Sequence, residues 1–202
     1  MKYIKCSNVV KQYNDNIVLN NFNFTFTNSY INFLQGANGT GKTTLILCIL
    51  DFLKYKGVIR HNMKKLLFQP EKVVLPDYIT VKTYLDIILK YHKQNCLYAE
   101  ELIKKFNMND KIEKDIITLS KGMKQKVLLI QTLMVESDCY IFDEPLSGLD
   151  PLSQEKFIDE IKKLFNNKKL VIIITHFPEH YNLENKLIID FNQKDCYGNF
   201  TS

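Results

Sequence analysis

A glycine-rich segment carries the clearest chemistry in this sequence. Glycines let the backbone turn so that successive N–H groups point inward as an anion nest, and a helix that follows directs its positive end to the same place. A lysine there suits β- and γ-phosphates, and a threonine hydroxyl suits Mg²⁺. The segment fits G-x-x-x-x-G-K-[ST], and its residues are Gly36, Ala37, Asn38, Gly39, Thr40, Gly41, Lys42, Thr43 and Thr44. We therefore predict a nucleotide site, with Lys42 on the phosphates and Thr43 on the metal.

Two adjacent carboxylates form the second candidate group. Asp143 and Glu144 follow the apolar run Cys139–Phe142, which is predicted to be a strand. Ligands of open parallel sheets bind beyond the carboxyl ends of the strands, where both side chains would lie. Asp143 could bind Mg²⁺ through a water molecule of the ion's coordination shell, and Glu144 could polarise the attacking water. Alone, such a pair most often solvates a loop, but the phosphate loop upstream favours the functional interpretation.

The elements that must position these residues begin as short strands. The strict alternation of Phe22–Phe26 indicates a half-buried antiparallel strand, and the run Tyr30–Leu34 leads directly into the glycine-rich turn. From Lys42 to Leu53 the pattern is helical, and Gly57 is expected to end it. The other strands predicted in this part are Tyr3–Cys6, Ile17–Leu19, Val58–Arg60 and Leu66–Phe68.

The rest of the chain is helical first and then alternates between strand and helix. Three helices are predicted between Glu71 and Leu133, near Val81–Tyr91, Ala99–Phe106 and Lys121–Val135. After them come a strand at Cys139–Phe142, a helix at Ser153–Asn166, and strands at Leu170–Thr175 and Lys186–Asp190. Strands joined by crossover helices indicate a parallel sheet. The sequence therefore predicts an α/β fold with a parallel sheet core, an N-terminal antiparallel β region and an inserted helical subdomain.

Composition excludes several classes of protein. The chain is 46% hydrophobic and 24% charged, as globular proteins are, which argues against disorder. Its net charge of +5 comes almost wholly from scattered lysines, so no nucleic-acid partner is expected. The longest apolar run, Leu45–Leu50, is far shorter than the about 20 residues that cross a bilayer. Met1–Lys5 shows neither a long apolar run nor a small-residue cleavage site, so no leader is expected. Five cysteines without a CxxC pair indicate no metal or disulfide framework, and Cys48 and Cys139 are expected to be buried.

A segment between the phosphate loop and the acidic pair indicates which family of nucleotide-binding proteins the chain resembles. Leu119–Lys126, LSKGMKQK, resembles the LSGGQ signature of the ATP-binding subunits of ABC transporters, and the resemblance extends over nearly the whole chain. Ser120 and Gly122 keep the pattern, whereas Lys121 replaces the first glycine and Met123 the glutamine. The segment begins a predicted helix, so its backbone N–H groups could face a phosphate. The resemblance implies a P-loop NTPase (RecA-like) fold, forming one ABC ATPase domain over 1–202 with parts 1–70, 71–133 and 134–202.

Other landmarks of the family follow in order, and the resemblance implies their roles. Gln69 matches the Q-loop, where it would touch Mg²⁺ or the water and report to the membrane subunit. Asp150, in the turn SGLDP, would lie at a dimer seam, and His176 would contact the γ-phosphate as the switch histidine. Tyr13 lies near where the family places an aromatic ring against adenine, with Tyr3 and Phe22 as competitors.

The resemblance implies an ATPase that needs two copies and a membrane partner. Two subunits would pair head to tail around two ATP molecules, with Mg²⁺ bound and with Glu144, His176 and Gln69 serving hydrolysis. A separate permease would dock in the groove between Gln69 and the helical insertion, which places the chain in the cytoplasm on the inner face of the membrane. The short chain, the SKGMKQK form and the SGLDP turn resemble exporter-type (ABC-2-like) subunits, with a peptide, drug-like or small hydrophobic cargo.

Two alternatives from other classes fit less of the sequence. A soluble ABC-type ATPase acting on nucleic acid or the ribosome would call for tandem cassettes or long coiled-coil insertions. A small-molecule kinase with a phosphate loop would leave the segments SKGMKQ and SGLD unexplained. The transporter subunit is therefore the leading hypothesis.

Overall fold

The structure, a computed structural model, describes residues 1–192. The contacts divide the chain into two compact units, which we describe separately. The sheet unit comprises Met1–Leu67, Ser137–Glu144 and the described residues from Leu164 onward, and the helical unit comprises Phe68–Glu136 and Pro145–Lys163. Within residues 1–192 no helix is both long enough and apolar enough to cross a bilayer.

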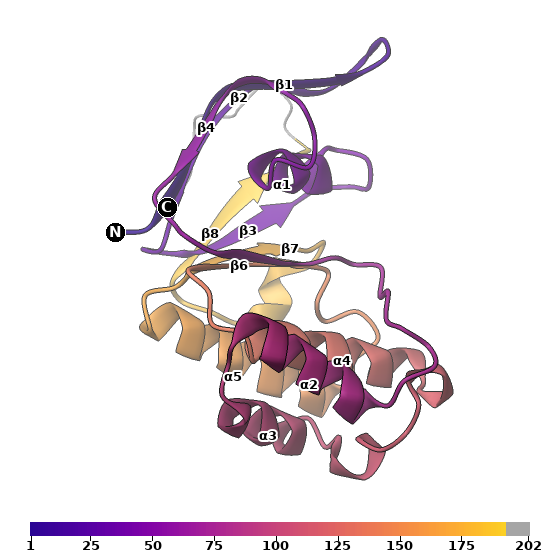
Figure 1. Ribbon diagram of the computed structural model, residues 1–202. Helices are drawn as coiled ribbons and strands as arrows, with labels where there is room; N and C mark the ends of the chain where they lie inside the picture. The colour runs from indigo at the N-terminus through magenta and orange to yellow at the C-terminus, as the bar shows by residue number, and fades with distance from the viewer. Residues whose placement is uncertain (193–202) are drawn as a thin grey trace. The chain divides into compact units, whose positions relative to one another are not determined.

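An antiparallel sheet of three strands forms one part of the sheet unit (Figure 1). Its order is β2-β1-β4, with bounds Tyr3–Tyr13 for β1, Asn16–Thr27 for β2 and Lys56–His61 for β4. Two predicted strands, 17–19 and 22–26, are one strand, and β1 continues well beyond Cys6. The reason is that Asn8 and Asn21 adopt φ of 50° and 54°, which asparagine tolerates, so the ladder continues through irregular registers rather than ending.

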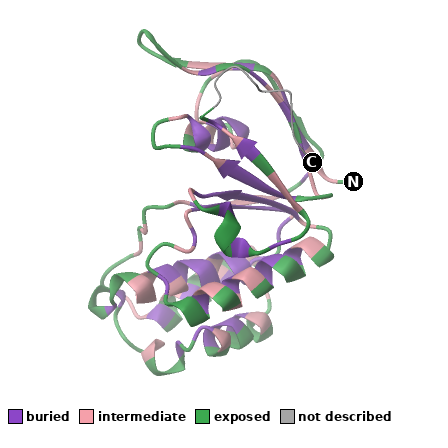
Figure 2. Cartoon of the chain, turned by 180° about the vertical axis from the view of Figure 1, so that it is seen from behind, coloured by how far each residue is buried: buried purple, intermediate pink, exposed green. Residues whose placement is uncertain are grey.

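The parallel sheet forms the core of the sheet unit. Its strand order is β5-β6-β7-β3-β8, and β3 pairs in parallel with both β7 and β8. The bounds are Ile31–Gln35 for β3, Leu66–Gln69 for β5, Cys139–Asp143 for β6, Leu170–Ile174 for β7 and Lys186–Asp190 for β8. Every residue of β6 and β7 is buried, as expected of central parallel strands (Figure 2). The prediction of an α/β fold with a parallel core is confirmed.

The helix after the glycine-rich turn is shorter than predicted. It is α1, Lys42–Ile49, rather than a helix to Leu53. Asp51 adopts φ 58°, and its N–H bonds the carbonyl of Cys48, which closes the helix. Gly57 lies within β4, so its predicted role as the helix terminator is wrong. Cys48 and Cys139 are fully buried, as predicted, whereas Cys196 lies outside the described residues.

Helices dominate the helical unit (Figure 1). Their bounds are Val81–His92 for α2, Cys96–Lys105 for α3, Lys121–Leu133 for α4 and Pro151–Asn166 for α5, whose last turn passes into the sheet unit. The three helices predicted between Glu71 and Leu133 are confirmed. Helix α3 starts earlier than predicted because the side chain of Asn95 accepts the N–H of Leu97 and caps the helix there.

A buried carboxylate ties α3 to α5 inside the helical unit. The side chain of Glu160 is only 1% exposed and accepts hydrogen bonds from Tyr98 Oη at 2.5 Å, Lys105 Nζ at 2.6 Å and Lys163 Nζ at 2.9 Å. Burial alone would raise the pKa of Glu160, but these three donors together hold it below its usual value. Because the charge is fully paired, it pins two helices without leaving an unsatisfied group.

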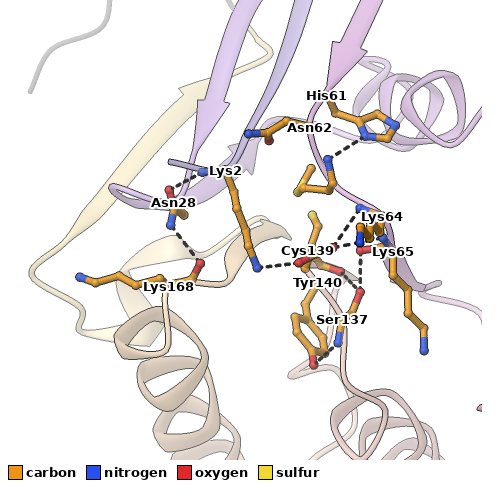
Figure 3. Close-up of polar contacts among 12 residues, drawn as sticks. Lys2, Asn28, His61, Asn62, Lys64, Lys65, Ser137, Cys139, Tyr140 and Lys168 are labelled. Carbon is orange, nitrogen blue, oxygen red and sulfur yellow. Dashed lines mark hydrogen bonds and ion pairs between the residues drawn. The ribbon is translucent and has the colours of Figure 1, made fainter. Parts of the chain in front are cut away.

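A second carboxylate ties three segments of the sheet unit together. The carboxylate of Asp138, just before β6, accepts hydrogen bonds from the ammonium of Lys2 at 2.8 Å and from the backbone N–H groups of Lys64 at 2.9 Å and Lys65 at 3.3 Å. The hydroxyl of Ser137 donates to the Lys65 carbonyl at 2.8 Å. Figure 3 shows Lys2, Lys64, Lys65 and Ser137 converging on this point. The N-terminus and the start of β5 are thereby held against β6.

Candidate functional site

The glycine-rich loop curls around a lysine. Gly41 has φ 103°, and a Cβ built there would lie 2.9 Å from the Cγ1 of Val18, so only glycine fits. Lys42, the first residue of α1, is 6% exposed, and its Nζ donates to the carbonyl oxygens of Gly36 at 2.7 Å and Ala37 at 2.8 Å. The ammonium therefore lies inside the loop, at the positive end of α1. A phosphate group fits this combination of cation, turn and helix end.

The loop is anchored by residues whose involvement the motif does not predict. Asn192, two residues after β8, accepts the N–H of Ala37 through its Oδ1 at 2.8 Å. The Asn192 N–H in turn donates to Asp190 at 2.8 Å, and the Thr40 hydroxyl donates to the Ala37 carbonyl at 2.9 Å. Because β8 is the parallel neighbour of β3, the strand before the loop, the two strand ends hold the loop from both sides.

Two of the three predicted metal ligands, Thr43 and Asp143, meet in the sheet unit, whereas Gln69 belongs to the helical unit. The hydroxyl of Thr43 donates to Asp143 Oδ2 at 2.8 Å, although the two residues are 100 apart in the sequence. Asp143 is 3% exposed at the end of β6, and Thr43 lies in the first turn of α1. A hydroxyl beside a carboxylate supplies the hard oxygen ligands that Mg²⁺ prefers. The residues present therefore fit this ion.

Glu144 and His176 also lie together, at the ends of β6 and β7. The carboxylate of Glu144 accepts the backbone N–H of His176 at 2.9 Å and the hydroxyl of Thr175 at 3.3 Å. The Nε2 of His176 is 3.7 Å from Glu144 Oε1 and 3.0 Å from Asn38 Oδ1. Glu144 adopts φ 46°, an unfavourable conformation that its N–H bond to the Ile174 carbonyl helps to hold. The structure thus brings the acid pair, the histidine and the phosphate loop into one site.

Of the three aromatic candidates for a base platform, Tyr13 has the best position. It ends β1 opposite Asn16, and Asn16 is two residues, or about 7 Å of strand, from the Val18 that packs on Gly41. Its side chain is 44% exposed, and Lys11 Nζ lies 4.7 Å from the ring centroid. Phe22 is fully buried, and Tyr3 pairs with Thr27 at the opposite end of the same hairpin. Only Tyr13 combines an open ring face with nearness to the loop.

The signature segment lies in the helical unit, at the start of α4. Ser120 caps the helix, its Oγ accepting the N–H of Met123 at 3.3 Å. A Cβ at Gly122 would lie 2.5 Å from the carbonyl oxygen of Gly148, so this position excludes any side chain. Lys121 is exposed, and this explains physically why a lysine can stand where the usual signature has glycine.

Asp150 makes hydrogen bonds and an ion pair within its own chain that its expected role at a dimer seam does not require. It caps α5 by accepting the N–H and the hydroxyl of Ser153, both at 2.9 Å, and it pairs with Lys126 Nζ of α4 at 2.7 Å. The hydrogen bond from Lys126 lowers the pKa of Asp150 to about 2. The cap was not predicted from the sequence, although an aspartate three residues before a serine at a helix start is a signal for one. The contact joins the signature helix to the loop before α5.

The helical unit also contains Gln69, the last of its candidate residues, and a cavity close to Gln69 in the sequence. Gln69 is fully buried at the end of β5, and among the described residues neither its Oε1 nor its Nε2 has a hydrogen-bond partner. Because an unpaired buried amide is costly, Gln69 is available to bind a polar group. The same unit has a cavity of about 610 Å³, to which Glu71, two residues after Gln69, contributes. The lining residues are Glu71, Lys72, Val73, Leu119, Lys121, Lys124, Gln125 and Ser147.

Residues 19–147 match the family model described as ABC transporter, which is more than half of the chain. The chain belongs to the ABC transporter family. ATP-binding domains of ABC transporters hydrolyse ATP, and the prediction of an ABC ATP-binding subunit is confirmed. So is the fold: a solved ATP-binding subunit of an ABC transporter superimposes with a TM-score of 0.83 at 23% identity, covering 93% of this chain and 85% of the other.

Curated relatives of this ABC chain bear different names. The zinc import ATP-binding protein ZnuC of Rickettsia bellii is 33% identical over 180 residues, which cover 86% of this chain and 76% of that protein. The uncharacterized ABC transporter ATP-binding protein YthP of Bacillus subtilis is 34% identical over 148 residues, 71% of this chain. That match spans only 63% of the length of YthP.

Proposed function

We propose that this chain hydrolyses ATP to drive transport through a separate permease. The observation that carries the proposal is the hydrogen bond between Thr43 and Asp143, beside a loop that encloses Lys42. This contact joins the phosphate loop to the acidic strand end in the arrangement that phosphoryl transfer requires. On this proposal, residues 1–202 act as one ATPase domain, and the chain requires no nucleic-acid partner.

The site residues divide the chemistry among themselves. Lys42 and the loop N–H groups bind the β- and γ-phosphates, and Tyr13 stacks on adenine. Thr43, Asp143 and Gln69 would hold Mg²⁺, Asp143 through water, and the bound ion neutralises phosphate charge. Glu144 orients and polarises the attacking water. His176 contacts the γ-phosphate, which its present position beside Asn38 supports.

A second copy completes the site in this proposal. Ser120 and Gly122 present the N-terminal end of α4 to the ATP held by the partner copy, so two identical chains enclose two nucleotides head to tail. The capped N-terminal end of this helix of 13 residues supports this role. Asp150 lies at the dimer seam, and its bonds to Ser153 and Lys126 fix the shape of that loop.

We further propose that the subunit docks on a permease at the inner face of the membrane and serves export. The cavity after Gln69 supports docking, because its lining combines the apolar Val73 with Lys72, which suits an acidic permease segment. The SKGMKQK form supports export of a peptide, drug-like or small hydrophobic cargo. Purification from membranes with a hydrophobic partner subunit tests the docking, and recovery of the chain without one under all conditions contradicts it.

The decisive experiment replaces Glu144 with glutamine. Glu144→Gln keeps the shape of the site but removes the charge that polarises water, so ATP binding should persist while turnover falls about 100-fold or more. An ATP-bound dimer should accumulate in size-exclusion chromatography. Glu184→Gln, at an exposed carboxylate of the same unit, is the matched control and should hydrolyse normally. Turnover at the unsubstituted rate in Glu144→Gln would refute the assignment.

A further inference from the structure

Tyr181 is a buried side chain with a polar hydroxyl that the mechanism does not use. Tyr181 ends a short helical turn, Pro178–Tyr181, five residues after His176, and it is 1% exposed. Its ring meets the edge of Phe33 at a centroid distance of 5.0 Å. Among the residues that the structure describes, no atom makes a hydrogen bond with the Tyr181 hydroxyl. An unsatisfied buried hydroxyl destabilises the fold, so its retention calls for a reason.

The sheet register places the ring of Tyr181 on the face that Phe142 shares, two residues before Glu144. Phe33 of β3, Ile173 of β7 and Phe142 of β6 are direct cross-strand neighbours, so their side chains share one face. Tyr181 covers that face at Phe33. Glu144 follows Phe142 by two residues, about 7 Å further along. Burial and then the nearby charge of Glu144 raise the pKa of Tyr181 well above 10, so the phenol stays protonated and can donate.

We propose that Tyr181 is a positioning residue for Glu144, donating its hydroxyl hydrogen bond through one buried water to the carboxylate. The proposal rests on the proposed role of Glu144 in hydrolysis. The carboxylate already accepts from Thr175 and from the His176 N–H, both in the segment that carries the switch histidine. A donor anchored on Phe33 in the core would keep Glu144 aimed at the attacking water while that segment responds to the γ-phosphate.

The substitution Tyr181→Phe removes one oxygen and keeps the ring. Loss of a hydrogen bond to a charged group should lower kcat about 10-fold, while the Kd for MgATP stays within twofold. Thermal stability should change little, because the ring and its contact with Phe33 are kept. The matched control is Tyr140→Phe, since Tyr140 is 2% exposed and its hydroxyl accepts the Ser137 N–H at 3.0 Å away from the site. This control should lose stability and keep kcat.

Two results would overturn the proposal. The first is an unchanged kcat in Tyr181→Phe, since the hydroxyl would then contribute nothing to catalysis. The second comes from a double-mutant cycle with Glu144→Asp: if Tyr181 acts through Glu144, its 10-fold effect should largely vanish in that background, whereas a persisting factor places its action elsewhere. The proposed function fails separately, through normal turnover of Glu144→Gln.

Discussion

Asp138→Asn is expected to destabilise the sheet unit by about 1–1.5 kcal/mol at neutral pH. The side chain accepts one ammonium, from Lys2, and two backbone N–H groups, from Lys64 and Lys65. Asparagine keeps the volume and one acceptor oxygen, but it loses the charge that all three donors face. The variant therefore tests the electrostatic part of this junction rather than its packing.

The magnitude follows from the pKa of Asp138. The hydrogen bond from Lys2 lowers this pKa from 3.8 to about 2, with further lowering by the Lys64 N–H. At about 1.36 kcal/mol per pKa unit, this corresponds to about 2.4 kcal/mol of folding free energy. The side chains of Lys2 and Asp138 are 27% and 29% exposed, so solvent screens the pair, and we halve the value to about 1–1.5 kcal/mol.

The dependence on pH has a definite sign. The pKa of Asp138 is lower in the folded state than in the unfolded state, so its ionisation favours folding. The stabilisation is complete above about pH 5 and is lost as pH falls from about 4 to about 2, leaving roughly half at pH 3. Because asparagine does not ionise, the gap in stability between the two proteins should shrink over the same range.

Urea unfolding at pH 7, 5 and 3 measures this gap. The control is Asp159→Asn, because Asp159 is 59% exposed and its contact with Lys162 is 3.7 Å, so this change should cost under about 0.5 kcal/mol at every pH. A gap for Asp138→Asn that is absent at pH 7, or that is equally large at pH 3, would refute the electrostatic account of the junction.

Two further predictions concern nucleotide binding and are checked by titration calorimetry. Lys42→Ala should raise the Kd for MgATP about 10-fold or more, because it removes the cation inside the loop, and an unchanged Kd would contradict the phosphate site. Lys11→Ala removes the ammonium from the Tyr13 ring and should weaken ATP about 2–5-fold while leaving inorganic triphosphate unaffected. Equal weakening of both ligands would count against Tyr13 as the base platform.

Local patterns in the sequence predicted much of the fold and the residues of the candidate phosphate loop. The phosphate loop could be recognised because its glycines, Lys42 and Thr43 are contiguous, and their chemistry depends on a short stretch of backbone. Hydrophobic periodicity likewise predicted the buried strands β6 and β7 and the three helices after Glu71. The predictions were wrong where local signals are weak. Asn21 at positive φ lets β2 continue where two strands were predicted, and Asp51 at positive φ ends α1 before Leu53.

Contacts between distant segments could not be predicted from such patterns. Asp150 was assigned by resemblance to a dimer seam, yet its bond to Lys126 and its cap on α5 depend on how α4 and α5 pack. Nothing in the sequence around Asp138 marks it as the partner of Lys2, and the unpaired hydroxyl of Tyr181 becomes visible only once β3 lies beneath it.

The sequence alone determined which groups are the candidates for the chemistry, since each motif carries its residue types within a few positions of the chain. The tertiary structure decided which of them meet. Thr43 and Asp143 touch across 100 residues only because β6 and the strand before the loop end at the same edge of one parallel sheet. Whether a segment forms a helix or a strand can be predicted from local propensity. The order of the strands cannot, because it arises from the burial of side chains that are far apart in the sequence.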